Sequence, residues 1–139
     1  IKTTPDNSAA AIEKYILDIG KIYEKYPSPE KTALDVLSEF VESTDEDGSA
    51  LSDLTPIITQ TENVVREMAL MTVPSDLVTT HLDVLNALQR LMENVADILL
   101  FETDAVVAAA AVNKYEENMT ALESAIAKLG ELVSAKLSI

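Results

Sequence analysis

The chain of 139 residues lacks cysteine and tryptophan, and it contains only 3 glycines and 5 prolines. Without cysteine it can form no disulfide, no thiolate metal site and no thiol nucleophile. The scarcity of glycine and proline argues against a turn-rich β fold and favours long helices. Aromatic residues make up only 4 % of the chain, which leaves few side chains to stack on bases or sugars.

Positive charge is also scarce, with 10 Lys and Arg against 24 Asp and Glu and a formal net charge of -14. Nucleic acids and anionic membranes are therefore poor partners, because their phosphates would be repelled. The apolar run at 105–112 and the mostly apolar segment 96–101, which includes Asp97, fall well short of the roughly 18 residues of a membrane span. We expect protein partners, no nucleic acid and no membrane insertion by this segment. The oligomeric state does not follow from the sequence.

Hydrophobic residues make up 47 % of the chain, and they recur three and four residues apart, as on one face of a helix. This spacing predicts five helices, at about 5–26, 29–43, 51–71, 75–101 and 105–134. Thr4 is expected to cap the first helix, Ser28 the second, and Thr103 or Asp104 the fifth. Pro56 indicates either that the third helix starts at Thr55 or that it is kinked there.

Short links between these segments favour antiparallel neighbours. The predicted fold class is therefore all-α, an up-and-down helical bundle of about five helices, three long and two at the N-terminus. We expect one domain over 1–139, in which a helix pair (1–43) and an acidic loop (44–50) precede three long helices (51–139). The fourth helix is apolar around more than one face, so it should lie centrally and pack on two sides.

Each predicted helix has a stripe of apolar residues that is expected to face the core. The stripes are Ile12, Ile16, Ile19, Tyr23 and Tyr26; Ala33, Leu34, Leu37, Phe40 and Val41; Leu54, Ile57, Ile58, Thr61, Val64, Val65 and Met68; Leu77, Leu85, Leu88, Met92, Val95 and Leu99, with Leu82, Leu91 and Ile98 beside them; and Ala105, Ala108, Val112, Tyr115, Met119, Leu122, Ile126, Leu129 and Val133. The last stripe is a heptad-like seam.

The acidic stretch 43–53 is the nearest approach to a metal motif. When Gly48 takes the place of the EF-hand glycine, Ser43, Asp45 and Asp47 fall at the first three ligand positions. Leu54 then stands where the bidentate glutamate must be, which leaves at most a weak calcium contact. We predict no metal site, no cofactor site and no catalytic residues, and hence no enzyme.

His81 is the sole histidine, and it lies on the apolar stripe with Leu77 and Leu85. A single histidine cannot supply the paired Glu-x-x-His motifs of a di-iron bundle. We interpret His81 as a core residue with one hydrogen-bond partner, which would be Tyr115 or one of Tyr15, Tyr23 and Tyr26. Such a polar pair can set the register of neighbouring helices.

The second half of the chain, in VPSDLVTTHLDVLNAL and LLFETDAVVAAAAVNKYEENMTAL, resembles uncharacterised helical proteins of candidate-phyla (Patescibacteria-like) bacteria. The matching residues are Pro74, His81, Leu82, Leu85, Asn86, Phe101, Asp104 and Tyr115. Ala105 replaces the proline that commonly follows the aspartate in that family. The resemblance implies a helical fold, an upstream membrane segment or signal, and no known reaction or ligand.

We therefore expect a non-enzymatic, extracytoplasmic helical bundle that acts through protein contacts in an envelope or surface assembly. The chain begins with Ile1 rather than Met, and we expect that an upstream segment, either a signal or an anchor, has been removed. A cytoplasmic location stays open. The alternative function is a sensing or carrier bundle that holds a small apolar molecule, for which a pocket lined by Met68, Met71, Met92 and Met119 would be evidence.

Overall fold

A computed structural model describes residues 1–42 and 49–138 and confirms a helical bundle. Five α-helices pack against one another, joined in part by 3-10 turns, and one small sheet of two strands is added. The helices are α1 (Ala9–Lys25), α2 (Ala33–Glu42), α3 (Leu54–Leu70), α4 (Val78–Ile98) and α5 (Ala105–Leu137), and the 3-10 turns are η1 (Ser49–Asp53), η2 (Ser75–Leu77) and η3 (Leu99–Glu102).

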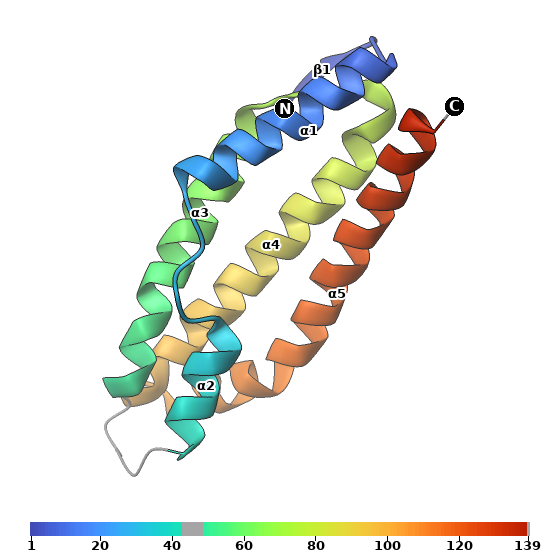
Figure 1. The fold of residues 1–139 in the computed structure, drawn as a ribbon. Helices are drawn as coiled ribbons and strands as arrows, with labels where there is room; N and C mark the ends of the chain where they lie inside the picture. Colours follow the sequence, from blue (N-terminus) through green and yellow to red (C-terminus); the bar gives the residue numbers. More distant parts are fainter. Residues whose placement is uncertain (43–48, 139) are drawn as a thin grey trace.

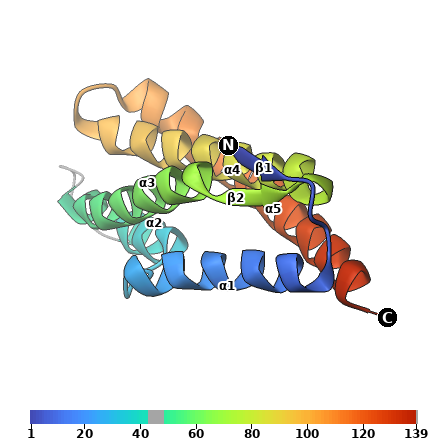
Figure 2. The same cartoon turned by 90° about the horizontal axis from the view of Figure 1, so that it is seen from above.

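Helices α3, α4 and α5 run side by side along the molecule, and α4 lies between the other two (Figure 1). Helix α1 covers one end of this layer and α2 covers the other end. Seen from above, α1 and α2 lie on the same side of α3 and α4 (Figure 2). The central position predicted for the fourth helix is confirmed, since α4 packs on both α3 and α5.

Two short strands that were not predicted, β1 (Lys2–Thr4) and β2 (Thr72–Pro74), pair in parallel. Thr3 lies opposite Val73, whose side chain is fully buried. The side chain of Asn7 extends this attachment, because its Nδ2 donates to Ser75 Oγ over 2.9 Å and its Oδ1 accepts from the backbone N–H of Asp76 over 3.0 Å. The N-terminal segment is thus tied to the start of α4.

Two predicted helix starts are wrong by a turn or more. The first helix is capped by Ser8, not by Thr4, and Ser8 Oγ accepts from the N–H of Ala11. Thr4 belongs to β1 instead, since its backbone pairs with Pro74. The second helix begins at Ala33 rather than after Ser28, because the preceding threonine forms a reciprocal capping pair with Asp35.

The other boundaries lie close to their predicted places. Asp104 caps α5, and its Oδ1 accepts from the N–H of Val107 over 3.1 Å. In the third helix Pro56 lies in the first turn, where its missing N–H costs no helical hydrogen bond. The acidic loop predicted at 44–50 lies outside the described residues, except for its last two.

The core consists of two clusters, one behind α1 and one behind α2. The α1 cluster contains Ile12, Tyr15, Ile22, Val64, Met68, Met71, Val73, Leu77, Val84, Leu85, Ala87, Leu88, Leu122, Leu129 and Val133. The α2 cluster contains Ala33, Val36, Leu37, Leu51, Leu54, Val95, Ile98 and Ala111. Leu91 of α4 packs against both clusters, so the core continues along the central helix.

Several residues predicted to face the core are exposed instead. In α1 the buried residues include Tyr15 and Ile22, one position before the predicted Ile16 and Tyr23. Leu82 of α4 also lies at the surface. Four further residues that were predicted to face the core are exposed, two in α2 and two in α5: Leu34, Val41, Val112 and Ile126.

Candidate functional site

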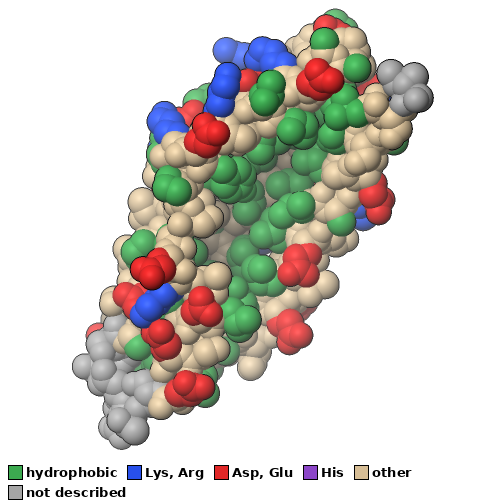
Figure 3. Space-filling view, in the orientation of Figure 1, with side chains coloured by type: hydrophobic (Ala, Val, Ile, Leu, Met, Phe, Trp, Pro, Cys, Tyr) green, Lys and Arg blue, Asp and Glu red, His purple; other side chains and the backbone are tan. Residues whose placement is uncertain are grey.

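An open groove runs between α2 and α5, with a volume of about 840 Å³. In the space-filling view, hydrophobic side chains line a hollow between α1 and α2 on one side and α5 on the other (Figure 3). We call the part between α2 and α5 the α2–α5 groove. Its apolar lining residues are Leu34, Leu37, Val41, Val112, Tyr115 and Met119.

The α2 wall exists because this helix is apolar over more than the face that it buries. Val36 is fully buried and Leu37 nearly so, and together they join α2 to the core. Leu34 and Val41 point elsewhere and keep 62 % and 77 % of their surface exposed. Leu37 contributes both to the α2 cluster and to the groove, so the core and the groove are continuous.

The α5 wall is part of the heptad-like seam. Ala108, Leu122 and Leu129 of this seam are buried, as predicted. Val112, which lines the groove, is 39 % exposed because α2 does not close over it, and Ile126, further along the seam, is 50 % exposed. The prediction that the whole seam faces inward is therefore wrong.

The rim of the groove is acidic. Glu42 of α2 and Glu116 and Glu123 of α5 line the groove together with two hydroxyl side chains, and no basic residue within 1–42 or 49–138 does so. Acidic side chains are visible on both sides of the lower part of the hollow in Figure 3. Tyr115 lies half-buried in the α5 wall, and burial raises the pKa of its hydroxyl.

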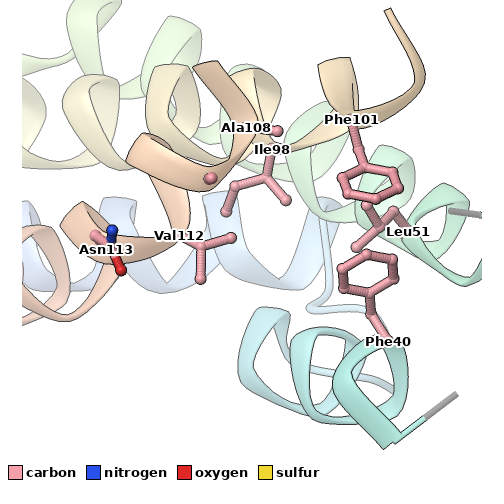
Figure 4. Close-up of a pocket in the computed structure, with 8 residues that line it drawn as sticks. Phe40, Leu51, Ile98, Phe101, Ala108, Val112 and Asn113 are labelled. Carbon is pink, nitrogen blue, oxygen red and sulfur yellow. The ribbon is translucent and has the colours of Figure 1, made fainter. Parts of the chain in front are cut away.

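A smaller pocket of about 280 Å³ adjoins the groove and shares Val112 with it. Figure 4 shows Phe101, Leu51 and Phe40 together at one end of this pocket and Asn113 at the other. The rings of Phe40 and Phe101 lie edge to face, with their centroids 5.0 Å apart. The lining is apolar except for Asn113. This pocket lengthens the apolar surface toward the end of the bundle.

His81 lies in the core, as predicted, and is fully buried. Its Nε2 donates to the carbonyl oxygen of Met68 over 3.0 Å, because a carbonyl can only accept. Its Nδ1 therefore accepts from the hydroxyl of Tyr15, over 2.8 Å. Tyr15 was among the partners considered, and the two hydrogen bonds join α1, α3 and α4.

Burial sets the protonation of this pair. It lowers the pKa of His81 and raises that of Tyr15, so both side chains are neutral near pH 7. The pair lies in the core behind α1, apart from the groove. Both ring nitrogens of His81 and the hydroxyl of Tyr15 are hydrogen-bonded within the core, so none of these atoms is available as a base or a nucleophile.

Asn94 is a second buried polar residue of α4. Its Nδ2 donates to the carbonyl oxygen of Ala111 over 2.7 Å and so links α4 to α5. Its Oδ1 has no hydrogen-bond partner among the described residues. Periodicity alone did not single out this link, because asparagine is common on exposed helix faces.

The four methionines do not line one pocket. Met68 and Met71 are buried in the α1 cluster, whereas Met119 lines the α2–α5 groove. Across 1–42 and 49–138, no three or more His, Asp or Glu side chains are grouped so that they could hold a metal ion. The EF-hand-like positions Ser43, Asp45, Asp47 and Gly48 lie outside the described residues. Within the same described ranges, no helix has the length and apolar character needed to cross a membrane.

Comparison of this chain with protein-family models, curated proteins and solved structures gave no match.

Proposed function

We propose that the chain is a non-enzymatic helical bundle that acts through protein–protein contacts, and that the α2–α5 groove is its contact surface. The observation that carries the proposal is the exposure of Leu34, Val41 and Val112 in one continuous apolar hollow. Monomeric proteins seldom leave a contiguous apolar patch open to water unless it binds something. Both walls of the groove are α-helices, which gives the groove a defined shape.

Site-specific photo-crosslinking in the native cells tests this proposal. A benzophenone amino acid is placed at Met119, in the groove, and in a matched variant at Val106, which is 81 % exposed on the same helix but does not line the groove. We expect discrete protein adducts from position 119 and none of the same mass from position 106. Equal adducts from both positions, or none from either, would contradict the proposal.

We also propose an extracytoplasmic or cell-surface location, in an envelope or surface assembly. Its support is the resemblance of the second half of the chain to helical proteins of candidate-phyla bacteria. The test is digestion of intact cells by an added protease, followed by detection of the chain with an antibody. Loss of the chain while a cytoplasmic marker survives is the expected result, and survival of both would count against this location.

A second candidate function is that of a carrier for a small apolar molecule. It is favoured by the apolar lining of the pocket between Phe40 and Val112. Its volume of about 280 Å³ is slightly smaller than that of most ligand sites, which measure roughly 300–1,000 Å³. Ala109→Trp fills this pocket from an exposed position and should abolish binding of an apolar dye such as Nile red. Unchanged dye binding would dismiss this pocket as the carrier site.

A further inference from the structure

We infer that the segment bound by the α2–α5 groove is an amphipathic helix whose apolar stripe is flanked by Lys and Arg. This inference rests on the proposed function and specifies the chemistry of the partner. Three features of the groove carry it: the acids of its rim, the placement of the chain's own lysines, and the helical form of its walls.

The acids of the rim stand where the flanks of a bound segment would lie. Glu42 stands at the end of the α2 wall, and Glu116 and Glu123 stand two turns apart on the α5 wall. Among the residues that the structure describes, no basic side chain lines the groove to neutralise them. A bound segment with Lys or Arg beside its apolar residues would place positive charge against these carboxylates.

The lysines near the groove are directed away from it. Lys31 is next to the lining residue Thr32, but its Nζ is 2.9 Å from a carboxylate oxygen of Glu39 and 3.2 Å from one of Asp53. On α5, the two lysines at 114 and 128 lie beside Arg90 on the outer face formed with α4. Helix α5 thus presents Glu116 and Glu123 to the groove, whereas Lys114 and Lys128 lie on its face toward α4.

The walls of the groove have the form that receives a helix. Leu34, Leu37 and Val41 are three and four residues apart, which makes a continuous ridge along α2. Val112, Tyr115 and Met119 form the facing ridge on α5 with the same spacing. A third helix packs between two such ridges with residues at i, i+3 or i+4, and i+7. The hollow is open along its length, unlike the enclosed sites that surround small ligands.

A second copy of the chain fits the groove less well than a basic helix does. In a two-fold contact the same surface of each copy meets itself. The α5 walls of the two copies, each with Glu116 and Glu123, would then face one another. Each copy also has a net charge of -14, which opposes their approach. Charge complementarity therefore favours a different, basic partner.

The test uses three synthetic helical peptides and the isotope-labelled full chain. One peptide has a leucine stripe flanked by lysines, the second has the same stripe flanked by glutamates, and the third is a scrambled form of the lysine peptide without a stripe. Backbone amide signals locate each binding site, and a titration gives each affinity. We expect the lysine peptide to shift signals of α2 and of 112–123 and to bind at least about tenfold more tightly than the other two.

Charge variants separate the groove from the general acidity of the chain. Glu116→Gln with Glu123→Gln should weaken binding of the lysine peptide by about 3- to 10-fold. The control is Glu117→Gln with Glu131→Gln, which removes the same charge from parts of α5 that do not line the groove and should change the affinity less than about twofold. Amide spectra of both double variants check that the fold is intact.

Each other result overturns the inference. If the glutamate peptide binds the groove as tightly as the lysine peptide, the partner chemistry is wrong while the groove still docks proteins. If the scrambled peptide binds equally, or if the two double variants behave alike, the attraction is only that of a polyanion. If no peptide shifts the groove signals, the inference fails. The photo-crosslinking at position 119 then tests the proposed function independently.

Discussion

His81 joins three helices through two buried hydrogen bonds, and its role follows from what each ring nitrogen can do. Nε2 donates to the Met68 carbonyl at the end of α3, and Nδ1 accepts from Tyr15 of α1. Both bonds require the neutral ring with its proton on Nε2. The pair therefore fixes how α1 and α3 sit against α4. It also explains why Tyr15, and not Ile16, faces the core with Ile12 and Ile22.

A double-mutant cycle tests this structural role. We expect His81→Leu to preserve the fold but lower the free energy of unfolding by about 2 kcal/mol, because the buried Tyr15 hydroxyl loses its partner. Tyr15→Phe should cost a similar amount. The combined variant should lose less than the sum of the two, since neither polar partner then remains. Urea unfolding gives all four values, and strict additivity would contradict the coupling.

The same histidine predicts a pH dependence. Burial holds the pKa of His81 in the folded chain below its ordinary value of 6.5. Below pH 6.5 the unfolded chain therefore binds a proton that the folded chain does not, and stability falls as the pH falls. The loss is at most about 1.4 kcal/mol for each pH unit until the folded pKa is reached.

His81→Leu removes this contribution and leaves the carboxylates in place. The stability difference between the native chain and His81→Leu should therefore shrink as the pH is lowered from 7.5 to 5. Urea unfolding of both proteins at several pH values measures it. A difference that is constant over this range would mean that His81 has the same pKa in the folded and unfolded chains.

At the scale of single elements, α2 shows how a helix is oriented by its neighbours. Its apolar residues occupy a face too broad to be buried on one side, so the spacing predicted Leu34 and Val41 inward and omitted Val36. In the structure Val36 is fully buried and contacts the α2 cluster. The capping pair of Thr32 and Asp35 fixes where α2 begins, and packing against the α2 cluster decides which of its faces is buried.

Two substitutions compare the two faces of α2. Val36→Ala should lower the free energy of unfolding by about 2 kcal/mol, because it removes two buried methyl groups and leaves a cavity. Leu34→Ala should change it by less than about 0.5 kcal/mol, since the leucine is largely exposed. Thermal or urea unfolding measures both. Equal losses would mean that α2 is rotated relative to this structure, and that the groove has a different lining.

At the scale of the whole molecule, charge and the open groove act against each other. The apolar hollow favours association, whereas the net charge of -14 keeps copies apart. Salt shortens the reach of that repulsion from about 10 Å at 0.1 M to about 3 Å at 1 M. Which effect dominates therefore depends on ionic strength.

We expect the chain to be monomeric at low salt and to form more dimer as salt is raised. Size-exclusion chromatography with light scattering, at fixed protein concentration and from 0.05 to about 1 M NaCl, measures this change. Val112→Ser with Met119→Ser should abolish the salt-induced dimer, while Val106→Ser should not. A dimer that is stable at low salt would contradict the repulsion between copies and would favour self-association in the groove.

The sequence by itself determined the five helices and the class of fold, but not the two strands. The structure confirms the five predicted helices. Two kinds of signal predicted them: the spacing of the apolar residues, and boundary residues such as Pro27, Pro74 and Asp104. Both act within a few residues along the chain. The same local information placed His81 in the core, between Leu77 and Leu85. It could also limit its partner to four tyrosines.

Only the tertiary structure decided which faces were covered. The pairing of Thr3 with Val73 joins segments about 70 residues apart, and no local pattern predicts such a contact. The groove depends on how far α2 stands from α5, and no local pattern shows that distance. The apolar residues Leu34, Val41 and Val112 were therefore all expected inside. Hydrophobic spacing tells which side chains would gain by leaving water, but burial needs a second surface, and only the packed molecule supplies or withholds it.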